Sequence, residues 1–173
     1  MPEQGFVLAV GRLVPEKGLD VLLNAVGLIE AASRPPVTII GIGPEREKLM
    51  LQARQLHIDL HLPGAISPRE MGNWYRRAQI VAVPSRREGF GLVAAEALAA
   101  GRVVVASSVG GITNFVRPGI SGLLVEPDDV EGFAKALQEV DPKWGIKGPE
   151  LVAHLGVEAH ARFVRQMYED LEI

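Results

Sequence analysis

The amino-acid sequence predicts an α/β fold, in which a doubly wound parallel sheet of about six strands is covered by helices on both faces. Three observations support this prediction. Short apolar segments alternate along the chain with segments of helical periodicity. The apolar segments are continuous rather than alternating, as in strands that are buried on both faces. Polar loops that contain glycine follow several of these segments, at the sheet edge where such folds bind ligands.

Three strands and two helices are expected in the first part of the chain. Apolar runs at 6–10 and 37–40 and a weaker run at 60–62 are typical of buried strands. The segment 18–32 is expected to be helical because its apolar residues recur at helical spacing. The segment 45–56 is expected to be an amphipathic helix.

The second part repeats the alternation. Strands are expected at 80–83, 103–106 and 122–125, and helices at 67–78, in the alanine-rich stretch before Gly101, at 128–140 and at 150–171, with a break near Gly156. Ser67 with Pro68 and Glu70 has the pattern of a helix start, and Asp128 with Glu131 has the same capping-box spacing. A glycine such as Gly101 commonly ends a helix.

Length and composition limit the classes of function. The chain has 173 residues, of which 47% are hydrophobic, which suits one well-packed domain with a tail. A net charge of −3 argues against nucleic acid as a partner. The sequence has no cysteine, which excludes disulfides and thiolate metal sites. No apolar run approaches the roughly 18 residues of a membrane span, and no signal-peptide pattern precedes the first strand, so a cytoplasmic protein is expected.

The stretch from Pro84 to Gly101 holds the main functional pattern. It leaves a predicted strand, passes through a loop with two glycines and enters a helix. Free backbone N–H groups and the helix dipole make such a loop an anion site. Glu88 and Glu96 are separated by seven residues there, and carboxylates beside a bound anion are suited to hold hydroxyl groups attached to it.

This spacing within E-G-F-G-L-V-A-A-E resembles the signature of retaining nucleotide-sugar glycosyltransferases of the GT-B fold, the group 1 or family 4 type. The segment Gly11 to Gly18, G-R-L-V-P-E-K-G, resembles the diphosphate-binding loop of the same family. The resemblance covers about residues 6–140. It implies a Rossmann-like donor-binding domain at 1–140, one half of a GT-B fold. Beyond it, the glycines and prolines after Asp141 suggest a linker, so residues 141–173 are expected to be a linker and a helical tail that packs on the same domain.

The resemblance also implies roles for individual residues. Arg12 and Lys17 are expected to bind the diphosphate and stabilise its departure, and Glu88 to contact the donor sugar, so these three are the candidate catalytic residues. Glu96 is expected to hold the ribose hydroxyls. The backbone at the remaining candidate positions is expected to approach the nucleotide or its phosphates: Gly11, Gly41, Gly43, Gly89, Phe90, Gly91 and Leu92. For Gly41 and Gly43 a tight strand-to-helix turn is an equally good interpretation.

No metal and no other cofactor are expected, and the donor is a nucleoside diphosphate sugar, such as a UDP-sugar or a GDP-sugar. The acceptor-binding domain that precedes the donor domain in GT-B enzymes is not recognisable here. The chain is therefore expected to be an excised piece, a truncated gene product or one subunit of a split enzyme, inactive in transfer on its own. The alternative is a nucleotide-binding regulatory or partner subunit without catalysis. No residues in the sequence support an epimerase, a phosphorylase or a dehydrogenase.

Other polar groups are expected to be structural. The four histidines lack metal-ligand spacing, and Trp74 and Tyr75 are expected to pack in or near the core. The Arg76–Arg77 and Arg86–Arg87 pairs favour a solvated face over a peripheral membrane contact or an acceptor site.

Overall fold

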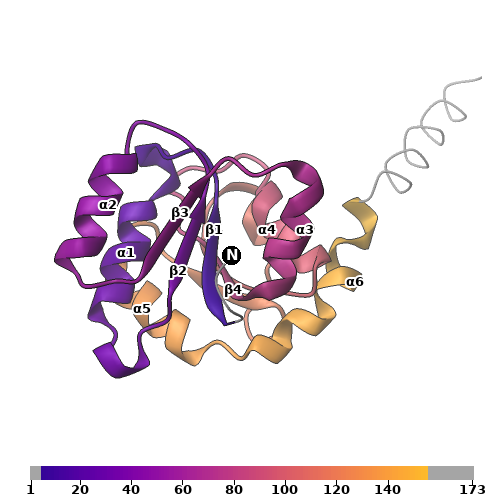
Figure 1. Ribbon diagram of the computed structural model, residues 1–173. Coiled ribbons are helices and arrows are strands. Elements are labelled where there is room, and N and C mark those ends of the chain that lie inside the picture. The colour runs from indigo at the N-terminus through magenta and orange to yellow at the C-terminus, as the bar shows by residue number, and fades with distance from the viewer. Residues whose placement is uncertain (1–4, 156–173) are drawn as a thin grey trace, which may run out of the picture.

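Six parallel strands form the centre of the computed structural model, which describes residues 5–155 (Figure 1). Their order across the sheet is β3-β2-β1-β4-β5-β6. This is the order of a Rossmann-like doubly wound sheet, so the predicted fold class is confirmed. The strands are β1 (Phe6–Val10), β2 (Val37–Ile40), β3 (Leu60–Gly64), β4 (Ala78–Val83), β5 (Val103–Ser107) and β6 (Gly122–Val125).

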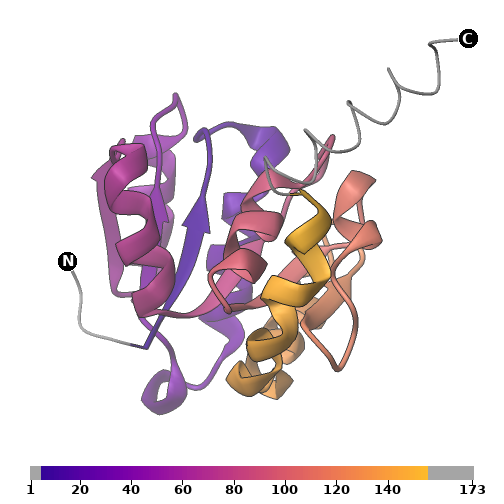
Figure 2. The ribbon, with the colours of Figure 1, turned by 90° about the vertical axis from the view of Figure 1, so that its right-hand side faces the viewer.

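Helices cover both faces of the sheet. Figure 1 shows α1, α2 and α5 on one side and α3, α4 and α6 on the other, and Figure 2 shows the second group turned toward the viewer. The helices are α1 (Leu19–Leu28), α2 (Arg46–Gln55), α3 (Pro68–Arg77), α4 (Leu92–Ala99), α5 (Val130–Glu139) and α6 (Gly148–Val152).

The two covered faces of the sheet explain why most strand positions are apolar. In β1, Val7 and Ala9 belong to the core formed with α1, α2 and α5, whereas Phe6 and Leu8 belong to the core formed with α3, α4 and α6. Successive side chains of a strand point to opposite faces, so each position of β1 needs an apolar residue. The continuous apolar runs therefore reflect two cores that share one sheet.

Three strands have the predicted bounds, and the others are longer. The structure extends β3 to Gly64 and β5 to Ser107, and it begins β4 at Ala78. The first helix is shorter than predicted: α1 ends at Leu28 because Ile29 is extended, and a separate 3-10 turn follows at Ala31–Ser33.

The expected cap of the fifth helix is shifted by one residue. Asp129, not Asp128, is the N-cap of α5, and its side chain accepts a hydrogen bond of 2.8 Å from the backbone N–H of Gly132. The predicted start of α3 is confirmed at Ser67, although the Ser67 hydroxyl donates to the Glu70 carboxylate at 2.7 Å instead of capping the backbone.

Residues 142–155 pack closely on the domain, where the sequence suggested a linker. They form 3-10 turns around α6, against α4 and β5. A Cβ atom at Gly145 would lie 2.5 Å from the carbonyl oxygen of Gly101, and one at Gly148 would lie 2.5 Å from that of Leu98. These glycines therefore allow close backbone contact. The division into a domain at 1–140 and a tail at 141–173 stays a prediction, and the expected helical stretch beyond residue 155, with its break near Gly156, lies outside the described residues.

Candidate functional site

The loops that follow β1 and β4 lie side by side at the carboxyl-terminal edge of the sheet. The backbone N–H of Arg86, in the loop after β4, donates a hydrogen bond of 2.9 Å to the carbonyl of Glu16, in the loop from Gly11 to Gly18. Gly18 has a φ of +61°, and a Cβ atom there would lie 2.0 Å from the carbonyl oxygen of Pro84, so the contact requires glycine. The chain winds outward in both directions from β1 and β4, and this switch point is where α/β sheets bind ligands.

Two predicted site residues meet across these loops. The Lys17 ammonium donates to the Glu88 carboxylate at 2.7 Å, and the two side chains are 23% and 15% exposed. The hydroxyl of Ser85, which is buried, lies 3.4 Å from the same carboxylate oxygen. Both charges therefore remain accessible to a ligand while each holds the other in position.

An open pocket of about 460 Å³ surrounds this pair. Its lining contains three cationic side chains, from Arg12, Lys17 and Arg87, and two carboxylates, from Glu16 and Glu88. The excess of cations suits a bound anion such as a phosphate. The two carboxylates can accept hydrogen bonds from hydroxyl groups that are attached to that anion. The sequence did not single out Arg87 from its arginine pair, and only the fold places it in this pocket.

The amino terminus of α4 begins beside the same loop. Gly91 is the N-cap residue with a φ of +84°, and a Cβ atom there would lie 2.7 Å from Cγ1 of Ile112. A glycine cap has no side-chain acceptor for the first N–H groups of the helix, which stay available to an anion. The adjoining apolar side chains of Phe90 and Leu92 are 54% and 60% exposed. The predicted phosphate contacts of this backbone, Gly89 included, stay a prediction.

Glu96 lies on α4 and faces a second depression. This depression encloses about 210 Å³, and Phe90, Leu92 and Val152 also line it. Glu96 is exposed, although the other residues of its helix are apolar. Its carboxylate nevertheless has a defined partner, because the hydroxyl of Tyr75 donates to it at 2.6 Å. Glu88 and Glu96 thus line separate depressions rather than one pocket.

Gly41 and Gly43 are explained by backbone packing. A Cβ atom at Gly41 would lie 1.8 Å from the carbonyl oxygen of Gly11, and one at Gly43 would lie 2.4 Å from that of Leu13. The loop after β2 therefore runs directly against the loop after β1, as the strand-to-helix turn interpretation expects. Their predicted contact with the nucleotide stays a prediction.

Arg86 connects the loop after β4 to the loop after β1, the first turn of α1 and the turn before α5, and the sequence did not indicate these contacts. Its guanidinium donates to both carboxylate oxygens of Asp20 at 2.9 Å, to Asp128 at 2.7 Å and to the carbonyl of Pro15 at 2.6 Å. Burial alone would raise the pKa of Asp20, but the hydrogen bonds and charge of Arg86 outweigh burial and lower it. Arg86 is thus an internal clamp rather than part of a solvated face.

The aromatic residues of α3 belong to the core, as expected. Trp74 and Tyr75 are 5% and 3% exposed, and the ring of His61 stacks on Trp74 at 5.9 Å between centroids. Arg76 is exposed and donates to Asn73. Among residues 5–155 no group of histidine and acidic side chains is arranged to hold a metal ion, and His160 lies outside that range. Within the same range no helix is long and apolar enough to cross a bilayer.

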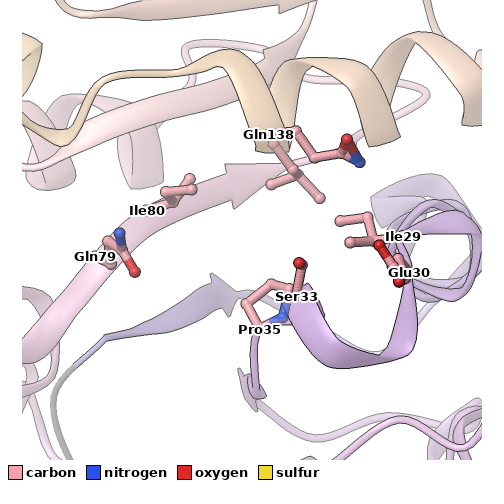
Figure 3. A pocket seen from close by; sticks show the side chains of 8 residues that line it. Ile29, Glu30, Ser33, Pro35, Gln79, Ile80 and Gln138 are labelled. Carbon is pink, nitrogen blue, oxygen red and sulfur yellow. The ribbon is translucent and has the colours of Figure 1, made fainter.

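A different pocket opens at the opposite edge of the sheet (Figure 3). It encloses about 420 Å³ near the first residues of β4, between Gln79, Ser33 and Gln138. Glu30 is the single charged residue in its lining. It offers no cationic group for a phosphate, so the pocket at the switch point is the better candidate site.

Comparison with known proteins shows the family of this chain. Residues 2–143 match the family model described as Glycosyl transferases group 1. The chain is 43% identical over 160 residues to D-inositol 3-phosphate glycosyltransferase of a Nocardioides species, which covers 81% of this chain and 35% of that protein. It is 33% identical over 178 residues to an uncharacterized glycosyltransferase of Methanocaldococcus jannaschii, covering 98% of this chain and 49% of that protein.

Solved structures show the same fold. Sucrose-phosphate synthase from Thermosynechococcus elongatus superimposes with a TM-score of 0.87 and 33% identity, over 99% of this chain and 46% of that one. HepE from Anabaena, in complex with UDP, superimposes with a TM-score of 0.80 at 21% identity, over 96% of this chain and 49% of that one. The chain spans little more than a third of the D-inositol 3-phosphate glycosyltransferases that it matches, at 35% and 36%. The match over residues 2–143 shows that the chain belongs to the Glycosyl transferases group 1 family.

Proposed function

We propose that this chain carries the donor-binding site of a retaining glycosyltransferase, which transfers a sugar from a nucleoside diphosphate sugar to an acceptor. The observation that carries the proposal is the pairing of Lys17 with Glu88 at the switch point of the sheet. Arg12 and Arg87 add positive charge to the same pocket, and the amino terminus of α4 lies next to it. The membership of the family and the names of the relatives support the same reaction class.

Each charged group has a part in this proposal. Arg12, Lys17 and the first N–H groups of α4 bind the diphosphate and stabilise the negative charge that grows as the glycosidic bond breaks. Glu88 accepts hydrogen bonds from the donor sugar and orients it. Glu96 accepts hydrogen bonds from the ribose hydroxyls. These side chains supply the charge stabilisation without a metal ion. The proposed location of the protein is the cytoplasm.

We further propose that the chain binds the donor but transfers sugar only when an acceptor-binding domain is present. The described residues form one sheet with its two helix layers, and the candidate residues in the loops after β1, β2 and β4 lie at one edge of it. A transferase must also hold the acceptor near the reacting carbon, and positioning of two reactants supplies much of the rate enhancement. Sugar transfer to an added acceptor by the chain alone would contradict this part of the proposal.

Thermal denaturation with UDP, GDP, ADP and their common sugar derivatives tests donor binding. A ligand at about 100 times its dissociation constant stabilises a fold by about 2.7 kcal/mol. At this size the melting temperature should rise by roughly 5–10 °C, since each kcal/mol corresponds to about 2–4 °C. Glu96→Ala should lose most of the shift, whereas Glu139→Ala, an exposed glutamate on α5, should keep it. The absence of a shift with every nucleotide would overturn the proposal.

A further inference from the structure

We infer that Tyr75 is a positioning residue for nucleotide recognition, because it fixes one oxygen of the Glu96 carboxylate and directs the other toward the ligand. The hydroxyl of Tyr75 lies 2.6 Å from Oε2 of Glu96, and no other hydrogen bond joins α3 to this carboxylate among the described residues. The inference rests on the proposed role of Glu96 as the group that binds the ribose hydroxyls. It goes beyond that role by assigning a function to a residue of the core.

The two ends of this hydrogen bond lie in different environments. Tyr75 is 3% exposed, whereas Glu96 is exposed on the surface of α4. An exposed glutamate normally samples several side-chain conformations, and ordering it costs entropy when a ligand binds. The hydrogen bond to the buried hydroxyl of Tyr75 already restricts the conformations of the Glu96 side chain. Ligand binding therefore costs less side-chain entropy at Glu96.

The position of the Tyr75 hydroxyl is itself fixed by the core. Its neighbour Trp74 packs edge-to-face on Phe6 of β1, with ring centroids 6.2 Å apart, and stacks on His61 of β3. These contacts hold α3 against the sheet. The position of the Glu96 carboxylate relative to the sheet is therefore fixed by Tyr75 as well as by its own helix.

The hydroxyl of Tyr75 also remains a donor under all ordinary conditions. Burial, together with the hydrogen bond to Glu96 and the charge of that residue, raises the pKa of Tyr75 well above its usual value. One lone pair of Oε2 is thus always occupied by Tyr75. A vicinal diol has two hydroxyl groups to donate, and Oε1 together with the second lone pair of Oε2 remains to accept them.

The test compares Tyr75→Phe with the wild type in calorimetric titrations against UDP, GDP and ADP, each beside its 2′,3′-dideoxy form. Phenylalanine fills the same space, and the exposed Glu96 can be solvated, so the variant should fold. We expect about a three- to ten-fold loss of affinity for the nucleotide that stabilises the wild type, and no loss for its dideoxy form. In a Glu96→Ala background, Tyr75→Phe should cause no further loss.

Other results would overturn the inference. An equal loss with the ribose and dideoxy forms would show that Tyr75 acts on the fold and not on hydroxyl recognition, and unchanged affinity for both would show no role. Glu96→Asp provides a second variant that leaves the core intact, because it keeps the charge but shortens the reach toward Tyr75. It should lose discrimination between the two forms as Tyr75→Phe does. Failure of the wild type to bind any nucleotide would overturn the proposed function as well.

Discussion

Lys17 and Glu88 are 71 positions apart in the sequence, and their side chains meet at 2.7 Å. The resemblance to the glycosyltransferase motifs predicted both residues as members of one site, and each lies in a glycine-containing loop after an apolar strand. The contact itself follows from the adjacency of β1 and β4, which brings the two loops together. Each charge is the partner of the other. Under the proposed function, a diphosphate competes with Glu88 for Lys17.

This competition predicts that Glu88→Gln raises the affinity for a bare nucleoside diphosphate. The substitution removes a negative charge from the pocket and frees Lys17, so binding should tighten by about two- to five-fold, which corresponds to the roughly 0.4–1 kcal/mol of a partly exposed charge pair. A donor that carries its sugar should gain less, because Glu88 is proposed to contact that sugar. Calorimetric titration with both ligands measures the difference.

Lys17→Met is the opposing control, since it removes the charge that the phosphates need and should weaken both ligands. Lys135→Met, on an exposed lysine of α5, should change neither. If Glu88→Gln weakens the bare nucleotide as much as the sugar donor, Glu88 does not compete for Lys17.

The sequence did not reveal the partners of Arg86 and Tyr75, and the reason is physical. Arg86 contacts Asp20 and Asp128, which are 66 and 42 positions away, and nothing in the local pattern of any of the three indicates a contact. Tyr75 was correctly expected in the core, but a packing pattern does not show where the hydroxyl points. Such contacts depend on how loops approach one another at the sheet edge, which periodicity and motif spacing do not specify.

At the scale of elements, strands were more predictable than helix ends. Strand positions that pack against a helix layer are mostly apolar, so the runs of β1, β2 and β6 could be bounded from the sequence. Helix ends depend on single capping contacts. Asp128 and Asp129 are chemically equal candidates for the cap of α5. The structure uses Asp129 for the cap and Asp128, whose φ is +63°, for the clamp with Arg86.

The Arg86 clamp connects the loop after β1, the first turn of α1 and the turn before α5. We expect Arg86→Met to lower the free energy of unfolding by about 1–2 kcal/mol, between the values of exposed and buried ion pairs. Asp20→Asn should have a smaller effect of the same sign. Urea denaturation at neutral pH measures both. Glu139→Gln, which removes an exposed pair at 3.8 Å on α5, should change stability by less than about 0.5 kcal/mol.

The pH dependence of the clamp has a definite sign. Burial raises the pKa of Asp20, but the hydrogen bonds and charge of Arg86 lower it by more. The pKa of Asp20 in the folded protein is therefore below its ordinary value of 3.8. The folded protein therefore binds this proton less readily than the unfolded chain. The stabilisation is present above about pH 4 and is lost as the pH falls through the lower folded pKa. The stability gap between wild type and Asp20→Asn should shrink on acidification, and a gap that widens would contradict the clamp.

At the scale of the whole molecule, strand alternation and loop position predicted the architecture and the edge that carries the candidate site. The packing of the final described segment could not be predicted, because glycine and proline have the same signature in a linker and in a close backbone contact. Gly145 and Gly148 lie against the backbone of α4 and β5. The segment therefore supports the helix that carries Glu96, rather than leaving the domain.

This support predicts opposite effects for two glycine-to-alanine substitutions. Gly148 has helical dihedral angles, so alanine suits its backbone, but the new Cβ would lie 2.5 Å from the carbonyl oxygen of Leu98 in α4. Gly148→Ala should lower the free energy of unfolding by about 1–3 kcal/mol, as overpacking does. Displacement of α4 should also weaken nucleotide binding.

Gly72 in α3 is the matched control. A Cβ atom there would meet only the tip of Arg76, at 3.5 Å, so Gly72→Ala should stabilise the fold by about 0.5–1 kcal/mol through helix propensity. Urea denaturation and nucleotide titration of both variants measure the effects. If Gly148→Ala has the same effects as Gly72→Ala on stability and on nucleotide binding, the segment after α5 does not hold α4 in place. Close packing against α4 would then not explain the glycines of that segment.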